Sequence, residues 1–87
     1  MHEFSLMADL MAKVLEIARQ QQAQRVTRVE VWLGALCHLS PSHFREHFEA
    51  AARGSVAEGA ALAVVTSADI HDARAGDVRL LSVDVLP

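Results

Sequence analysis

The chain has 87 residues, of which 52% are hydrophobic, and a formal net charge of −3. This length suits one small domain, and the apolar content favours a packed core over intrinsic disorder. The acidic balance lacks the basic footprint of nucleic-acid binding, and no apolar run approaches the roughly 20 residues of a membrane helix. The start shows no signal-peptide pattern and Cys37 is the only cysteine, so we expect a cytoplasmic protein without an internal disulfide.

Residues 5–22 carry apolar side chains at three- and four-residue spacing. Leu6, Leu10 and Val14 recur on one side of the pattern, while Lys13 falls on the other side with further polar residues. A repeat near 3.6 residues is typical of an amphipathic helix that buries one face. The glutamine-rich end of this segment predicts a frayed last turn followed by a connection.

Residues 26–36 change to a two-residue repeat, which is typical of a strand with one buried face. One face would carry the apolar set Val29, Val31, Leu33 and Ala35, and the other would carry Arg28, Glu30 and Trp32. Trp32 would cover part of the second face. Gly34 inside the strand indicates a bulge or a close approach of another backbone segment.

Ser40-Pro41 predicts the start of a second helix, because a hydroxyl side chain caps helix N-termini and proline suits the first helical position. The helix should end at Arg53, with Gly54 as the left-handed residue that follows it. Its predicted buried stripe consists of Phe44, Phe48, Ala51 and Ala52.

Residues 61–65 and 78–85 read as two further strands, separated by a polar loop at 67–77. The order helix, strand, helix, strand, strand predicts an α+β fold in which two helices pack on one face of a small three-stranded mixed sheet. The first two strands would be parallel neighbours across the second helix, and the last two could pair as an antiparallel hairpin. We expect residues 1–87 to form a single domain without internal repeats.

The first three residues, Met1, His2 and Glu3, carry a candidate metal chelate. The α-amine, the peptide nitrogens of His2 and Glu3, and the His2 imidazole can reach one metal ion through small chelate rings. Planar nitrogen sets of this kind favour Ni(II) or Cu(II) over Zn(II). A histidine at a chain end is more often simply solvated, because termini are commonly disordered, so the dipeptide alone does not establish a site.

The chain opens with Met1-His2-Glu3-Phe4-Ser5-Leu6, and residues 29–36, 54–62 and 78–85 follow as three further segments with recognisable motifs. In this order they resemble the HypA/HybF family of hydrogenase nickel-incorporation proteins. The opening is similar to the family's Met-His-Glu-x-Ser-Leu, and the later segments resemble, respectively, its first strand, its Gly-Thr-x-x-Glu-Gly-Ala-x-Leu segment and its closing strand. The resemblance covers most of the chain.

The resemblance implies a nickel metallochaperone and not an enzyme. It implies that Met1, His2 and Glu3 bind Ni(II), and that the partners are a HypB-type GTPase and the large subunit of [NiFe]-hydrogenase. It leaves open self-association into a homodimer. The alternative from another class is an adaptor that keeps the docking surface of the family but transfers no metal.

The sequence departs from the family pattern in one respect. Family members normally carry a zinc-binding lobe with two CxxC pairs before the last strand, and this chain has neither pair. A loop at about 66–77 takes its place, and His71, Asp69 and Asp72 cannot replace four thiolates in so short a segment. We therefore expect no structural zinc, and a short form of the family.

Other polar residues offer weaker hypotheses. His43 and His47 lie one helical turn apart within a His-x-x-Glu-His pattern, which matches an inverted zinc-protease motif. A protease needs a third ligand and a substrate cleft, so surface binding of nickel or zinc by this pair is the better interpretation. Cys37 with His38 reads as a small buried thiol beside a loop histidine. No catalytic relay or glycine-rich phosphate loop is present.

Overall fold

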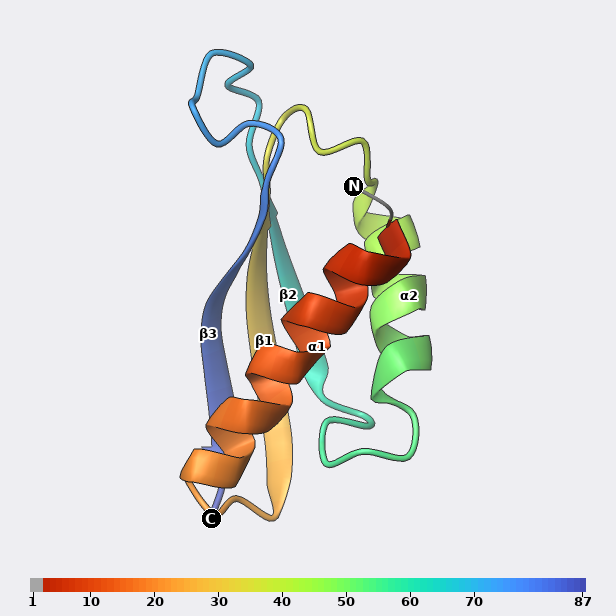
Figure 1. Cartoon of the computed structure of the whole chain (residues 1–87), viewed down its shortest axis with the longest axis vertical. Helices are drawn as coiled ribbons and strands as arrows, with labels where there is room; N and C mark the ends of the chain where they lie inside the picture. Colours follow the sequence, from red (N-terminus) through yellow and green to blue (C-terminus); the bar gives the residue numbers. More distant parts are fainter. Residues whose placement is uncertain (1–2) are drawn as a thin grey trace.

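The computed structural model describes residues 3–87, with side chains from Ser5 onward. Two helices lie on one face of a three-stranded sheet, whose other face carries no helix (Figure 1). The described residues extend over 39 × 19 × 19 Å. The predicted α+β class and the order of elements are confirmed.

Helix α1 (Glu3–Gln20) is the amphipathic helix that the spacing predicts, shifted by two residues toward the N-terminus. Met7, Leu10, Val14 and Ala18 are buried, whereas Asp9, Lys13 and Glu16 are exposed. The helix lies diagonally across the sheet and contacts β1 and β3. After it, Gln22 adopts a positive φ of 53°, which reverses the chain toward the first strand.

Strand β1 (Arg25–Leu33) is the centre of the sheet. It pairs in parallel with β2 (Ala61–Thr66) and antiparallel with β3 (Val78–Leu86), so the strand order is β2-β1-β3. The predicted parallel pair is confirmed. The predicted hairpin between the last two strands is wrong, because β1 lies between them.

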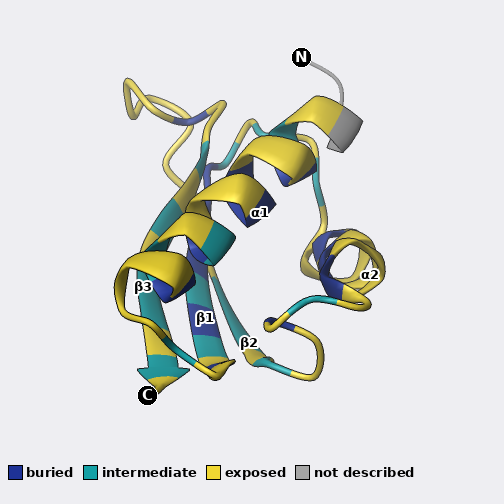
Figure 2. Cartoon of the chain, turned by 60° about the horizontal axis from the view of Figure 1, so that its bottom comes forward, coloured by how far each residue is buried: buried dark blue, intermediate teal, exposed yellow. Residues whose placement is uncertain are grey.

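The central place of β1 explains its burial. Val26, Val29, Val31 and Leu33 are at most 1% exposed, whereas the core-facing residues of β2 and β3, which are also apolar, are only half-buried. The middle strand has a neighbour on each side and lies beneath the helix layer, so its apolar face is covered most completely (Figure 2). On the open face, Trp32 is half-buried and lies opposite Val65 and Arg79.

Helix α2 (Pro41–Ala52) begins as predicted. The backbone N–H of His43 donates to the Ser40 hydroxyl over 3.2 Å, which is the expected N-cap. The helix stops one residue earlier than predicted, with Arg53 at the C-cap and Gly54 at a φ of 81°. One part of the predicted stripe is wrong: Ala51 is exposed, because it lies at the edge of the face that Phe44, Phe48 and Ala52 bury, on the side away from Ala52.

The predicted close approach at Gly34 is confirmed, although β1 ends at Leu33. A Cβ atom on Gly34 would lie 2.3 Å from the backbone oxygen of Ala75, so only glycine fits without a shift. Two hydrogen bonds join these segments: Gly34 N–H donates to the Asp77 carbonyl over 2.9 Å, and Leu36 N–H donates to the Ala75 carbonyl over 2.7 Å. The end of the β2–β3 loop is therefore fastened to the end of β1.

Candidate functional site

The predicted nickel ligands Met1 and His2 lie outside the described residues, as does the side chain of Glu3. The backbone of Glu3 begins α1. In Figures 1 and 2 the N-terminal half of α1 lies toward α2, and its C-terminal half lies over the strands. The donor set Met1, His2 and Glu3 therefore stays a prediction from the sequence.

The histidine pair of α2 is within the described residues, and its members lie together. His43 and His47 are both exposed, and their ring centroids are 6.2 Å apart with an interplanar angle of 65°. Phe44 and Phe48 form the neighbouring pair, with centroids 6.4 Å apart and both rings buried. The helix thus carries two parallel pairs, one phenylalanine pair in the core and one histidine pair at the surface.

The β2–β3 loop uses its acidic side chains to hold its own backbone. One Asp69 carboxylate oxygen accepts the backbone N–H of His71 over 2.9 Å, and one of Asp72 accepts that of Arg74 over 2.8 Å. Short aspartate side chains commonly stabilise turns in this way. Among the residues that the structure describes, no three His, Cys, Asp or Glu side chains are grouped to hold a metal ion.

The β1–α2 loop places Cys37 and His38 beside α1. The Cys37 thiol is half-buried and donates to the Leu39 carbonyl over 3.7 Å, so the prediction of a buried thiol is only partly met. His38 is exposed and has a positive φ of 64°. This conformation is uncommon for a residue other than glycine, although histidine tolerates it better than bulky side chains do.

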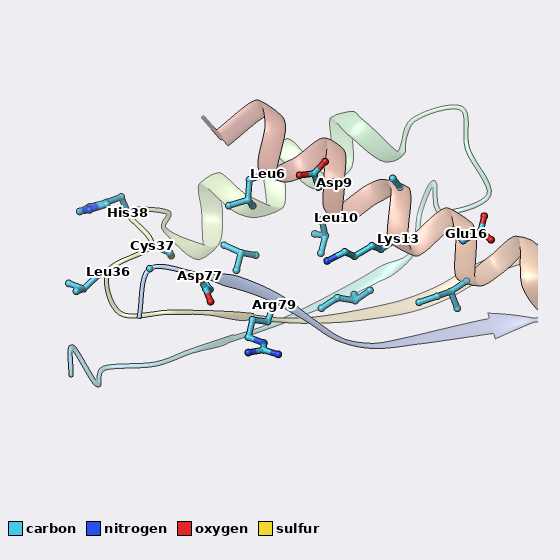
Figure 3. Close-up of a pocket in the computed structure, with 15 residues that line it drawn as sticks. Leu6, Asp9, Leu10, Lys13, Glu16, Leu36, Cys37, His38, Asp77 and Arg79 are labelled. Carbon is cyan, nitrogen blue, oxygen red and sulfur yellow. The ribbon is translucent and has the colours of Figure 1, made fainter. Parts of the chain in front are cut away.

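These two residues form one end of an open groove of about 1100 Å³ along α1. Figure 3 shows its walls, which come from α1, the β1–α2 loop and the start of β3. The charged residues that line it are Asp9, Lys13, Glu16, Asp77 and Arg79. Because both signs of charge are mixed, the groove selects no single class of ligand. Sequence reasoning missed it since its walls are three segments far apart in the chain.

One ion pair on α1 alters the titration of both its members. The Arg19 guanidinium donates to both carboxylate oxygens of Glu16, over 2.9 and 2.6 Å. These hydrogen bonds, with the opposite charge, lower the pKa of the Glu16 carboxyl, and Glu16 in turn raises the pKa of Arg19. Both side chains are exposed, so the pair belongs to the helix surface.

No helix in the described part of the chain has the length and apolar character needed to cross a membrane.

Comparison with known proteins supplies the family. Residues 1–71 match the sequence model of a family described as hydrogenase/urease nickel incorporation, metallochaperone, HypA. The chain is 44% identical over 62 residues to the hydrogenase maturation factor HypA of Methylocella silvestris, covering 71% of this chain and 55% of that protein. It is 39% identical over 72 residues to the protein of the same name from Archaeoglobus fulgidus, covering 82% and 66%. The chain thus spans less than two thirds of the length of these relatives.

The fold is also similar to that of solved structures. The solution structure of the nickel metallochaperone HypA from Helicobacter pylori superposes with a TM-score of 0.81 at 25% identity, covering 99% of this chain and 98% of that one. A second solution structure of a HypA protein gives a TM-score of 0.76, also at 25% identity, covering 98% and 96%. The family match over residues 1–71 and the shared fold together show that this chain belongs to the HypA family.

Proposed function

We propose that this chain binds Ni(II) through Met1, His2 and Glu3 and delivers it for the maturation of [NiFe]-hydrogenase. The observation that carries the proposal is the opening Met1-His2-Glu3 at the start of a family match that begins at residue 1. The relatives' names support the same role, because they describe nickel incorporation and hydrogenase maturation.

The donor chemistry of the three residues suits this role. An α-amine, two peptide nitrogens and an imidazole form a nitrogen plane, which favours Ni(II) and Cu(II) over Zn(II). Each of these donors must lose or lack a proton to bind, so acidification weakens binding. These properties fit a carrier, which must release its cargo.

Delivery requires partners, and we propose that they are a HypB-type GTPase and the large subunit of [NiFe]-hydrogenase. The chain acts in the cytoplasm as a carrier and not as an enzyme. It has no glycine-rich phosphate loop, so nucleotide hydrolysis belongs to a partner. A homodimer is a further form to test, because β3 is an edge strand and unpaired strand edges can join a second copy.

We further propose that residues 1–87 act as one domain without the zinc lobe of longer relatives. The described residues share one hydrophobic core to which both helices and all three strands contribute. The segment Ser67–Asp77 connects β2 to β3 directly, and the chain has one cysteine in place of two CxxC pairs. This form would bind nickel and need no zinc to fold.

The test is isothermal titration of the untagged protein with Ni(II), beside a His2→Ala variant. Intact mass measurement first checks that the chain starts with an unmodified Met1, because an N-terminal extension removes the amine ligand. We expect a yellow, diamagnetic nickel complex in the wild type that is lost in His2→Ala. Equal binding and equal spectra in both proteins would refute the N-terminal site. Weak binding by both proteins would favour the adaptor role or the His43/His47 pair.

A further inference from the structure

Helix α2 presents a second arrangement of metal-binding side chains, separate from the N-terminus. His43 and His47 are four residues apart, so they project from the same side of the helix about one turn, or roughly 6 Å, apart. The measured separation of the ring centroids, 6.2 Å, agrees with this spacing. Both residues are exposed, and four residues is the spacing at which two imidazoles on one helix bind a common ion.

The helix beneath the pair is held in place by its own packing. Phe44 and Phe48, each one residue after a histidine, are at most 1% exposed and belong to the central core. Their burial fixes the rotation of α2 about its axis, so the histidine side cannot turn inward. The Ser40 hydroxyl accepts the backbone N–H of His43 over 3.2 Å and holds the first turn. The backbone positions of both histidines are therefore set before any metal arrives.

Two imidazoles at this spacing supply two donors of a coordination shell. Imidazole nitrogen suits nickel, copper and zinc, and histidines four residues apart on a helix bind one metal in the HExxH enzymes. No third His, Cys, Asp or Glu completes a group among the described residues. Within the described part of the chain, the pair therefore supplies two donors, and other donors or water would fill the remaining coordination positions. Such a site holds a metal weakly and exchanges it readily.

We propose that His43 and His47 form a second, weaker site for a divalent metal of the nickel, copper and zinc group. Helix α2 lies beside the half of α1 that begins at Glu3 (Figures 1 and 2). A nickel ion released from the N-terminus can be taken up there on its way to a partner. This relay role rests on the proposed nickel function, whereas metal binding by the pair does not.

The two sites differ in nickel spectroscopy, which separates their tests. Nickel in a planar nitrogen set is diamagnetic, whereas nickel held by two imidazoles and water is six-coordinate and paramagnetic. The experiment titrates the untagged, isotope-labelled full chain with Ni(II) alone and follows its amide NMR signals. We expect a second equivalent of Ni(II) to broaden the signals of residues 40–50 selectively. His47→Ala should abolish this broadening and weaken the second binding step more than about tenfold.

Matched variants define the control and the refutation. His71→Ala removes another exposed histidine, from the β2–β3 loop, and should leave the second step unchanged. His47→Ala should fold, because the side chain is exposed and alanine favours helix; circular dichroism checks this. A second step that is absent in the wild type, or insensitive to both His43→Ala and His47→Ala, overturns the α2 site. Loss of only the planar complex in His2→Ala, with the broadening retained, shows that the two sites are independent. Failure of the planar complex alone refutes the N-terminal proposal and leaves the α2 site standing.

Discussion

Replacement of Gly34 by alanine tests whether the end of β1 and the β2–β3 loop are packed against each other as the structure shows. The added Cβ would lie 2.3 Å from the Ala75 backbone oxygen, 2.6 Å from its carbonyl carbon and 2.8 Å from the Arg74 oxygen. All three neighbours are backbone atoms, so no flexible side chain can turn aside. The loop must move away from the strand end.

The expected destabilisation follows from three contributions. Overpacking of this kind costs about 1–3 kcal/mol. Movement of the loop also weakens the hydrogen bonds from Gly34 N–H and Leu36 N–H, each worth about 1 kcal/mol. Alanine has less conformational freedom than glycine in the unfolded chain, which offsets about 0.4–1 kcal/mol of this destabilisation. We expect the free energy of unfolding to fall by about 2–4 kcal/mol, which for a domain of this size lowers the Tm by at least about 10 °C.

Gly76→Ala is the matched control on the same loop. A Cβ at Gly76 would meet no heavy atom within 4 Å, and its φ is not in the left-handed region. Thermal and urea unfolding of both variants should show a loss for Gly34→Ala and no loss for Gly76→Ala. Hydrogen exchange at the Leu36 amide, which donates to Ala75, should become faster only in Gly34→Ala. Equal stability of the two variants would refute the contact.

Four further substitutions test the helices. Ala52→Lys places a charge at a position that is 1% exposed and should destabilise the fold by several kcal/mol in urea unfolding. Ala51→Lys, at an exposed position, should change the free energy of unfolding by less than about 0.5 kcal/mol. Similar losses in both variants would contradict the observed rotation of α2 about its axis. Ser40→Ala removes the N-cap of α2 and should lower the free energy of unfolding by about 1 kcal/mol, and an unchanged Tm would contradict this. Glu16→Gln removes the ion pair with Arg19, which lowers the pKa of the Glu16 carboxyl. A lowered folded-state pKa stabilises the protein above the unfolded pKa, and this contribution is lost as the pH falls through the folded pKa. The Tm difference between wild type and Glu16→Gln should therefore be small at about pH 7 and vanish once the pH falls below the lowered folded-state pKa of Glu16. A difference that grows on acidification would refute the assignment.

The local elements were predictable because their signals are local. The Ser40 cap and Gly54 bracket α2 within one residue of its observed end, since both act through backbone groups next to them in the chain. The two-residue repeat after Gln24 identified β1 for the same reason. Ala51 was misplaced because alanine is compatible with either side of a helix, and its neighbour Ala52 takes the buried direction.

Strand order and the groove were not predictable in this way. Both arise from segments distant in sequence, and a short antiparallel hairpin is the default for consecutive strands. All three strands carry an apolar face toward the core, so their apolar patterns do not decide which strand lies at the centre of the sheet. The two metal-site hypotheses differ in the same way in how far local spacing could predict them. The spacing of His43 and His47 predicted their proximity, whereas the N-terminal donors are a matter of chain-end chemistry and family motif, which a fold does not determine.

The strand order β2-β1-β3 has a consequence for how this fold can change in evolution. The segment between β2 and β3 joins the two outer strands across the end of the central one, so no hairpin turn dictates its length. Hydrogen bonds fasten its last residues, because Gly34 N–H donates to Asp77 and Leu36 N–H donates to Ala75. The stretch before Ala75 is left as the variable part. Each doubling of a flexible loop adds only about 0.6 kcal/mol of closure free energy. An extra lobe can therefore be gained or lost at this point while every strand pairing is retained.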